Sequence, residues 1–162
     1  MATTVTASDL TVTINDSLTL NGVSYGGSTS KLDTGCNQAV QRVFDVKVKS
    51  TGEAAQTWTD LFKLSTANDA GTGITGEFQY ARITNLDATN FILLQLVTEA
   101  SNNRIMIKLN AGESYIVNNK EMIAIDGAAP ASGYEAISNL ATIRAAADTA
   151  AVDVEIFLGF KS

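Results

Sequence analysis

The chain has 162 residues, of which 45% are hydrophobic and 17% are charged, with a single proline and 12 glycines. This composition excludes a disordered or fibrous protein. At this length a domain removes roughly 70% of its unfolded surface from water, so residues 1–162 are expected to form one domain that needs no disulfide bond or metal ion for stability. The 11 basic residues stand against 17 acidic ones, a net charge of −6. That balance argues against binding to nucleic acid or to anionic lipid, because both need a basic surface.

Two further classes are not expected. The start of the chain has neither a basic segment nor an apolar one, and no segment approaches about 18 apolar residues, so we expect neither a secretory signal nor a transmembrane helix. Cys36 is the single cysteine, which excludes an internal disulfide framework. We expect Cys36 to be an unpaired thiol.

The predicted elements, taken in chain order, begin with a short strand. Residues 10–14 alternate apolar and polar side chains, residues 15–17 predict a turn, and residues 18–20 continue in extended form. Residues 21–38 are mostly turn formers and predict the longest irregular segment. Together with residues 1–9 they are expected to be arm-like, and either mobile or fastened to something outside their own core.

The middle of the chain contains the longest apolar run. Strands are predicted over 40–48 and 57–64. Residues 78–84 are aromatic and β-branched, residues 85–90 are turn formers, and residues 91–97 are apolar except for one glutamine. This pattern predicts a hairpin whose second strand lies buried in the middle of a sheet.

The C-terminal part continues the pattern of strands. Three short strands are expected over 104–109, 114–117 and 122–125. Residues 152–160 alternate strictly, which is typical of a strand with one exposed face. Residues 141–147 also alternate, and 148–150 would join them to the last strand as a hairpin. The alternative for 136–147 is a helix, because alanine favours helices.

The count is about ten short strands, with turns every 8 to 12 residues and no convincing amphipathic helix. This is typical of an all-β protein built as an antiparallel β-sandwich. Among sandwiches the jelly-roll type fits best, because it places eight or more antiparallel strands in two packed sheets.

Residues able to carry chemistry are scarce. Histidine is absent, which excludes histidine-activated nucleophiles and histidine-bound metals. Residues 71–76 match the G-x-G-x-x-G spacing, but a strand follows where a dinucleotide site needs a helix, so they predict a flexible loop. Two pairs, Asn68–Asp69 and Asn85 with Asp87, have too few acids for a calcium loop and predict turns. Four acids fall at strand ends, where solvated turns place acids anyway: Glu77, Asp87, Glu99 and Glu113. We therefore predict no catalytic, cofactor-binding or metal-binding residue, and no enzyme.

Aromatic residues leave one binding function open. Five could stack on sugars at a binding face: Trp58, Tyr25, Tyr80, Tyr115 and Tyr134. Trp58 and Tyr80 fall in phase with apolar neighbours, which favours core packing for both. Arg82 shares this predicted face with Phe78 and Tyr80, and we expect it to be a buried or interface arginine held by a nearby carboxylate.

Several segments resemble one family. The stretch Tyr80–Asn90 is similar to a segment of virion structural proteins of tailed phages, notably those of cyanobacterial and marine hosts. The sequence Leu109-Asn-Ala-Gly-Glu-Ser114, the alanine-rich strand over 141–147 with its alternating partner, and Leu18-Thr-Leu-Asn-Gly22 fit the same family. The shared positions are strand and turn determinants, and none of them is catalytic.

The resemblance implies a jelly-roll head cement or decoration protein. Such a protein is made in the host cytoplasm, binds the outer surface of the capsid, and stabilises the shell by bridging major capsid subunits. It needs no cofactor, nucleic acid or membrane, and is expected to form a homo-oligomer, a trimer in preference to a dimer. The alternatives are a tail- or fibre-associated component of the same virion, or a carbohydrate-binding sandwich.

Overall fold

The computed structural model describes residues 8–48, 58–63, 78–98, 104–118, 121–122 and 138–161. This part of the chain is all-β and contains no helix. Its strands are β1 (Ser8–Leu20), β2 (Val23–Cys36), β3 (Gln38–Val46), β4 (Thr59–Lys63), β5 (Phe78–Asn85), β6 (Ile92–Thr98), β7 (Arg104–Leu109), β8 (Ser114–Val117), β9 (Glu121–Met122), β10 (Ser138–Ala147) and β11 (Val152–Phe160). The prediction of an all-β antiparallel sandwich is confirmed.

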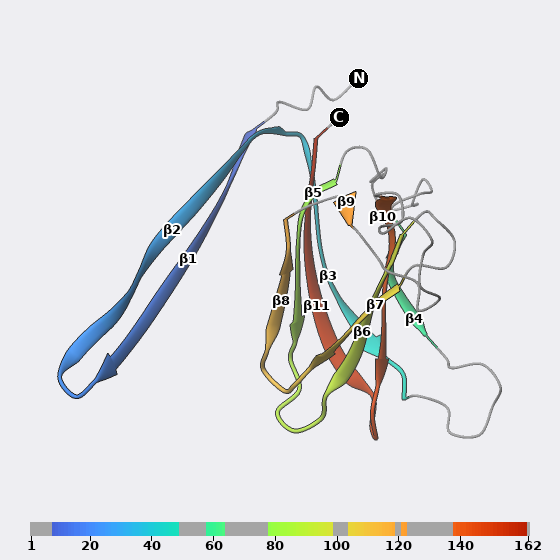
Figure 1. Cartoon of the computed structure of the whole chain (residues 1–162). Helices are drawn as coiled ribbons and strands as arrows, with labels where there is room; N and C mark the ends of the chain where they lie inside the picture. The colour runs from blue at the N-terminus through green and yellow to red at the C-terminus, as the bar shows by residue number, and fades with distance from the viewer. Residues whose placement is uncertain are drawn as a thin grey trace, which may run out of the picture.

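Two sheets form the body of the molecule (Figure 1). One has four strands in the order β3-β11-β5-β8, and the other has the order β4-β10-β6-β7 with β9 paired to β10. The alternation predicted for β11 is confirmed, because Val152, Val154, Ile156, Leu158 and Phe160 are all at most 1% exposed. These side chains pack against the equally buried Ile92, Leu94, Leu96 and Ile143 of the other sheet. The predicted central strand over 91–97 is therefore an inner strand, β6.

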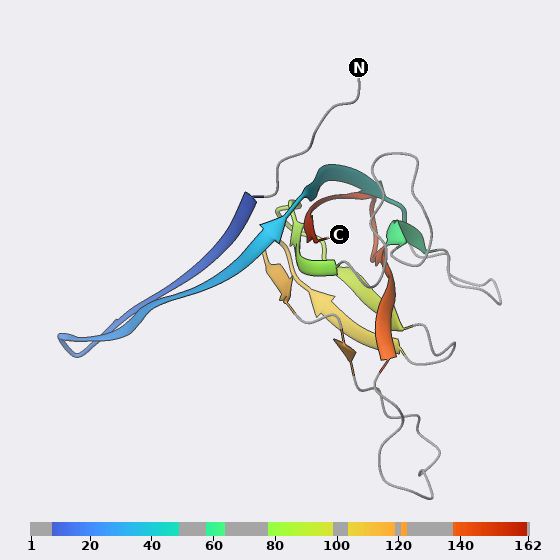
Figure 2. The same ribbon diagram turned by 90° about the horizontal axis from the view of Figure 1, so that it is seen from above.

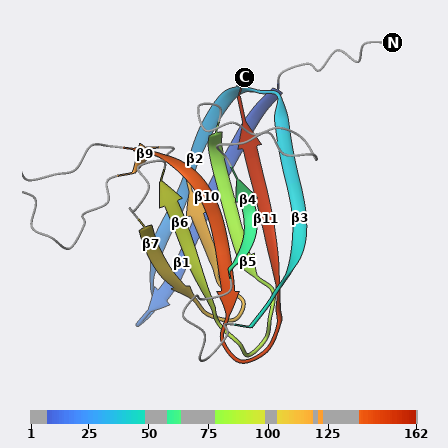
Figure 3. The same ribbon diagram turned by 90° about the vertical axis from the view of Figure 1, so that its right-hand side faces the viewer.

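The pairing of the body strands is nested. β6 pairs with β7, β5 with β8, β4 with β10, and β3 with β11, all antiparallel. β6 and β7 follow each other in the chain and lie side by side in one sheet. Each of the other connections between these eight strands carries the chain from one sheet to the other. Figure 3 shows the two layers, with β11 and β5 on one side and β10 and β6 on the other.

Both predicted hairpins in the body are wrong for this reason. β5 and β6 lie in different sheets, and so do β10 and β11. The turn formers of 85–90 and 148–150 are present, but they carry the chain across the core instead of reversing it within one sheet. Two backbone hydrogen bonds fasten these crossings, from Leu86 N to Asp153 O (2.9 Å) and from Asp148 N to Phe91 O (3.3 Å). The helix alternative is also wrong, since β10 is a strand over the described part of 136–147.

β1 and β2 form a separate two-stranded sheet that projects from the sandwich (Figure 1). We call this hairpin the arm. Its strands pair without a break from Leu10 with Asp33 to Leu20 with Val23. The turn between them is Asn21-Gly22, with φ of 50° and 80°, the two left-handed positions that a tight type I′ hairpin turn requires.

The predictions for this region need correction. Residues 15–17 are not a turn but the middle of β1, and residues 21–38 are not irregular, because most of them form β2. The glycines and hydroxyl residues of β2 resemble a loop because the strand is exposed on both faces and has no core to fill. Of the other predicted arm, residues 1–7 lie outside the described residues, and Ser8 and Asp9 begin β1.

Candidate functional site: the projecting arm and its root

The arm has two chemically different faces. Residues directly opposite each other in an antiparallel pair lie on the same face. By this register one face carries Leu10, Val12, Ile14, Leu18 and Leu20 of β1 together with Val23 and Tyr25 of β2. The other carries mainly hydroxyl and amide side chains, among them Thr13 and Ser30, whose hydroxyl oxygens lie 3.0 Å apart. The same face also carries Asp16, Lys31 and Asp33, and Leu32 lies on the other face. The arm is therefore an amphipathic ribbon whose first face is mainly apolar in its outer part, and this face is called the apolar face below.

The apolar face is exposed over the outer part of the arm. Leu18, Leu20, Val23 and Tyr25 are 53–56% exposed, and Ile14 is 47% exposed. These five residues are called the tip patch below. An isolated two-stranded hairpin is marginally stable in water, and this one also holds large apolar side chains in solvent. The tip patch is thus a surface suited to burial against another protein.

The root of the arm is fixed to the four-stranded sheet. Leu10 lies over Gly159 of β11, so close that a Cβ added to Gly159 would stand 2.9 Å from Leu10 Cδ2. Here Gly159 admits the arm by having no side chain. At the other strand of the arm, Lys31 Nζ donates a hydrogen bond to the carbonyl oxygen of Asn118 (3.3 Å) and forms an ion pair with Asp33 (3.3 Å).

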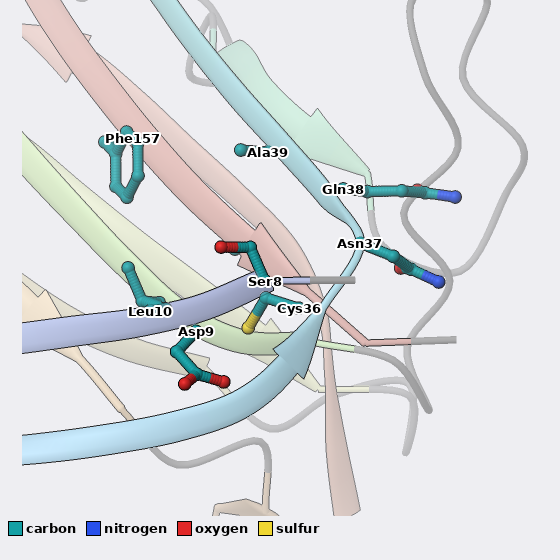
Figure 4. A pocket seen from close by; sticks show the side chains of 9 residues that line it. Ser8, Asp9, Leu10, Cys36, Asn37, Gln38, Ala39 and Phe157 are labelled. Atoms are coloured by element: carbon teal, nitrogen blue, oxygen red, sulfur yellow. The ribbon is translucent and has the colours of Figure 1, made fainter. Parts of the chain in front are cut away.

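A shallow pocket of about 280 Å³ lies beside this root, where β1 begins and β2 passes into β3 (Figure 4). Leu10 and Phe157 are apolar residues that line it, and Asp9, next to Leu10 on β1, and Cys36 are also part of its lining. Burial, followed by the charge of Asp33, raises the pKa of the Cys36 thiol. The thiol stays protonated at neutral pH and donates a weak hydrogen bond to the carbonyl of Asp33 (3.8 Å). Cys36 is a free, half-buried thiol.

A second hollow of about 420 Å³ lies between β1 and the outer face of the four-stranded sheet. On its floor Arg82 Nη2 donates to Glu155 Oε2 (2.9 Å), and Gln41 donates to Glu155 Oε1 (2.7 Å). The predicted pairing of Arg82 with a carboxylate is confirmed, although its side chain is 42% exposed and so is not buried. Tyr80 packs edge-on against Phe157 with ring centroids 6.0 Å apart, and burial raises its pKa.

One detail of the Arg82 prediction is wrong. The pairing of β5 with β11 shifts register between Tyr80 and Phe78. Phe78 therefore points into the core, where it packs edge-on against Phe160 with centroids 6.2 Å apart, whereas Tyr80 and Arg82 share the outer hollow. A period of two cannot reveal such an irregularity, because it changes which residues share a face.

The other aromatic candidates are dispersed. Tyr25 is in the tip patch, and Tyr115 packs against the edge of the core. Trp58 is half-buried and lies under the Arg144 guanidinium at 5.1 Å, on the sheet opposite the arm. Tyr80 is buried, but in the hollow under β1 and not in the core between the sheets. The predicted core packing is therefore wrong for Tyr80 and for Trp58. Tyr134 lies outside the described residues, and the four described aromatics do not gather on one face.

The predicted turn acids are structural. Asp87 Oδ1 accepts hydrogen bonds from the backbone N–H groups of Asn90 (2.6 Å) and Thr89 (2.7 Å), which lower its pKa. Glu113 accepts from the backbone N–H of Asn110 (2.8 Å), with the same effect on its pKa. The turn assignment for Asn85 with Asp87 is confirmed, because Asn85 Oδ1 accepts from Asp87 N (3.0 Å).

Other predicted positions lie outside the described residues: Asn68, Asp69, the loop 71–76, Glu77 and Glu99. Among the residues that the structure describes, no three acidic or cysteine side chains are grouped so as to hold a metal ion. Nor does that part of the chain contain a helix long and apolar enough to cross a membrane. The tip patch was missed from the sequence because Leu18, Leu20, Val23 and Tyr25 come together only once Asn21-Gly22 is recognised as a hairpin turn.

Comparisons of this chain with protein-family models, with curated proteins and with solved structures found no match.

Proposed function

We propose that this chain is a structural protein of a tailed-phage virion, a cement protein that binds the outer surface of the head and bridges major capsid subunits. The observation that carries the proposal is the arm. It leaves a well-packed sandwich and holds an apolar patch in solvent, which suits a protein whose task is to reach across to a neighbour. Its strand of 13 residues would extend about 40 Å at the usual rise per residue.

We also propose that the body is a jelly roll. A jelly roll is an antiparallel ribbon of paired strands rolled into two sheets. The nested pairs β6–β7, β5–β8, β4–β10 and β3–β11 support this, because they divide the ribbon between the sheets in that way. Most of the sequence segments similar to tailed-phage virion proteins lie in these strands and turns, and Leu18–Gly22 lies at the tip of the arm. A jelly roll with a projecting arm is compatible with the class of protein that the resemblance implies.

The test is reconstitution on purified phage shells that lack the protein. We expect the full chain to bind the shells and to raise the temperature at which they break. In a matched variant, residues 15–28 are replaced by Asn-Gly, which removes four of the five tip-patch residues but keeps the root. This variant is expected to lose most of the stabilisation. Absence of binding by the full chain would reject the proposal.

A tail- or fibre-associated role is the alternative from the same resemblance. Labelling virions with an antibody against this chain separates the two. Label over the head supports a cement protein, and label confined to the tail replaces it with a tail component.

A further inference from the structure

We propose that the arm docks on a second copy of this chain, with its tip patch on the outer face of the strands β4, β10, β6 and β7. This inference deepens the proposed function, on which its biological setting rests, because it names the neighbour that the arm reaches. The receiving surface is called the basic face below, and it lies on the side of the sandwich away from the arm (Figure 2).

The basic face is defined by register. β6 and β7 place Leu93 opposite Lys108, Gln95 opposite Met106, and Val97 opposite Arg104. β10 continues the same rows with Ala146, Arg144 and Thr142. The alternate residues of β6, Ile92, Leu94 and Leu96, are fully buried in the core, so these rows face outward. The result is three parallel rows that mix apolar and basic side chains.

The exposed apolar side chain of the face is Met106, because Gln95 and Ala146 in the same rows are only 3% and 1% exposed. Arg144 donates to Gln95 (2.6 Å) and lies over Trp58, so the exposed positive charge beside Met106 comes from Arg104 and Lys108. Met106 is 54% exposed, and Leu93 and Val97 are half-buried beside it.

The strands β4, β10, β6 and β7 carry four basic residues and one acid (Lys63, Arg104, Lys108 and Arg144 against Asp60), a balance of +3 in a chain whose net charge is −6. Lys63 is already paired with Asp60 (3.0 Å), so the positive charge of these strands comes from Arg104, Lys108 and Arg144. Strands β3, β11, β5 and β8 carry two basic residues against three acids, a balance of −1.

The arm has the complementary character. Its strands hold Asp9, Asp16 and Asp33 against Lys31, a balance of −2. Lys31 is already paired with Asp33, whereas Asp16 lies on the apolar face between Ile14 and Leu18. Opposite Asp16 is Gly27, which has nothing within 4 Å of where a Cβ would be. This leaves a gap in the tip patch for a long side chain such as Met106, with Asp16 beside it to meet an arginine.

The geometry of the two surfaces also agrees. Both are pleated, with rows about 6.7 Å apart and strands about 4.8 Å apart, as face-to-face sheet packing requires. The tip patch spans residues 14–20 of β1, about 23 Å at the usual rise per residue, so with a width of about 10 Å a single contact covers roughly 230 Å² on each copy and buries about 460 Å² in total. That is less than a standard stable interface.

The symmetry of the assembly follows from the contact. Because the tip patch and the basic face are different surfaces, the contact is head-to-tail and can close a ring in which every copy makes two contacts.

The experiment measures the mass of the full chain in solution by sedimentation equilibrium. We expect the wild-type chain to form a closed oligomer at high concentration, with a mass that is a multiple of 17.1 kDa. Leu18→Asp with Tyr25→Asp is expected to reduce the mass to that of one chain. The matched control is Ser17→Asp with Ser24→Asp, which adds the same charges at neighbouring positions on the opposite face of the arm, and it should leave the oligomer in place.

The receiving surface is tested in the same way. Met106→Asp is expected to give a monomer, whereas Val43→Asp, at an exposed residue on the outer side of the other sheet, should not. Exchanging charges provides the rescue: Asp16→Arg and Arg104→Asp each weaken association, and the chain carrying both regains it. A wild-type chain that is monomeric at high concentration, or a Met106→Asp chain that keeps its oligomer, would overturn the inference.

These outcomes are separable from those of the proposed function. Shell binding by a chain that remains monomeric would retain the cement protein and remove the arm-to-copy contact. Conversely, oligomers that depend on Leu18, Tyr25 and Met106 but do not bind shells would retain the contact and remove the cement protein.

Discussion

The sandwich and the arm use the same kind of strand in opposite ways. In β11 every second side chain is buried to 1% exposure or less, and the alternation closes a core between two sheets. In β1 the alternation is interrupted only by Asp16, but its apolar residues remain about half-exposed beyond Val12. Alternation therefore defines a face without saying what covers it. In the sandwich the second sheet covers it, and in the arm we infer that another copy does.

The largest expected difference in the free energy of unfolding is between a large apolar residue of the sandwich and one of the arm. Phe160 is fully buried and packs against Phe62 with ring centroids 5.4 Å apart. Phe160→Ala is expected to lower the free energy of unfolding by about 3–5 kcal/mol, because it removes a buried ring and leaves a cavity. Leu20→Ala in the arm should change it by less than about 0.5 kcal/mol in dilute monomeric protein. Urea denaturation measures both, and equal effects would mean that the arm folds as part of the core.

The next largest effect is expected where the chain crosses between the sheets. Asn85 is fully buried, and its side-chain amide donates to the carbonyl oxygens of Asn90 (2.9 Å), Asn110 (3.1 Å) and Leu109 (3.2 Å). Asn85→Ala leaves these carbonyls without that donor, at an expected cost of about 2–3 kcal/mol. Asn15→Ala, at an exposed position in the arm, is the control and should be nearly neutral. If Asn85→Ala lowers the free energy of unfolding no more than Asn15→Ala does, water has replaced the amide as the donor to these carbonyls.

The Asp87 turn gives a smaller effect that depends on pH. Backbone hydrogen bonds from Asn90 and Thr89 lower the pKa of Asp87 below its ordinary value of 3.8. A lowered pKa in the folded state stabilises the fold above the unfolded pKa, and this contribution is lost as the pH falls through the folded pKa. Wild-type protein should therefore exceed Asp87→Asn in Tm at neutral pH, and the difference should decline below pH 3.8. A Tm difference that is independent of pH would exclude the carboxylate as its cause.

The sequence predicted the sandwich well because its strands are strongly patterned. β11, β7, β8 and the inner position of β6 follow from apolar alternation or from an apolar run alone. Which strands pair could not be predicted in the same way. Residues 85–90 contain good turn formers, but whether a turn reverses the chain within a sheet or carries it across the core depends on Asn85 and on carbonyls from a distant turn near Leu109. Those contacts exist only in the folded molecule.

The candidate site was harder to predict than the fold. An arm-like segment was expected, but it was placed over 21–38 as an irregular stretch, because glycine and hydroxyl residues dominate β2. The Asn-Gly pair at 21–22 was the available signal for a hairpin. The basic face carries no sequence signal at all, since Arg104, Met106 and Lys108 become neighbours of Arg144 only through the pairing of β6 with both β7 and β10.

The smallest expected effect is the most direct test of whether the two regions are independent. Replacing residues 15–28 with Asn-Gly closes the shortened arm at the Ile14–Thr29 pair. This pair is an even number of residues from Leu20–Val23, the natural closing pair, so the new turn meets the same type of hydrogen-bonded pair as the natural turn does. The tip patch makes no contribution to the core cluster. The free energy of unfolding of the monomer should therefore stay within about 0.5 kcal/mol of the wild-type value. Thermal and urea denaturation of dilute protein measure this, and a loss of several kcal/mol would mean that the arm stabilises the sandwich from which it projects.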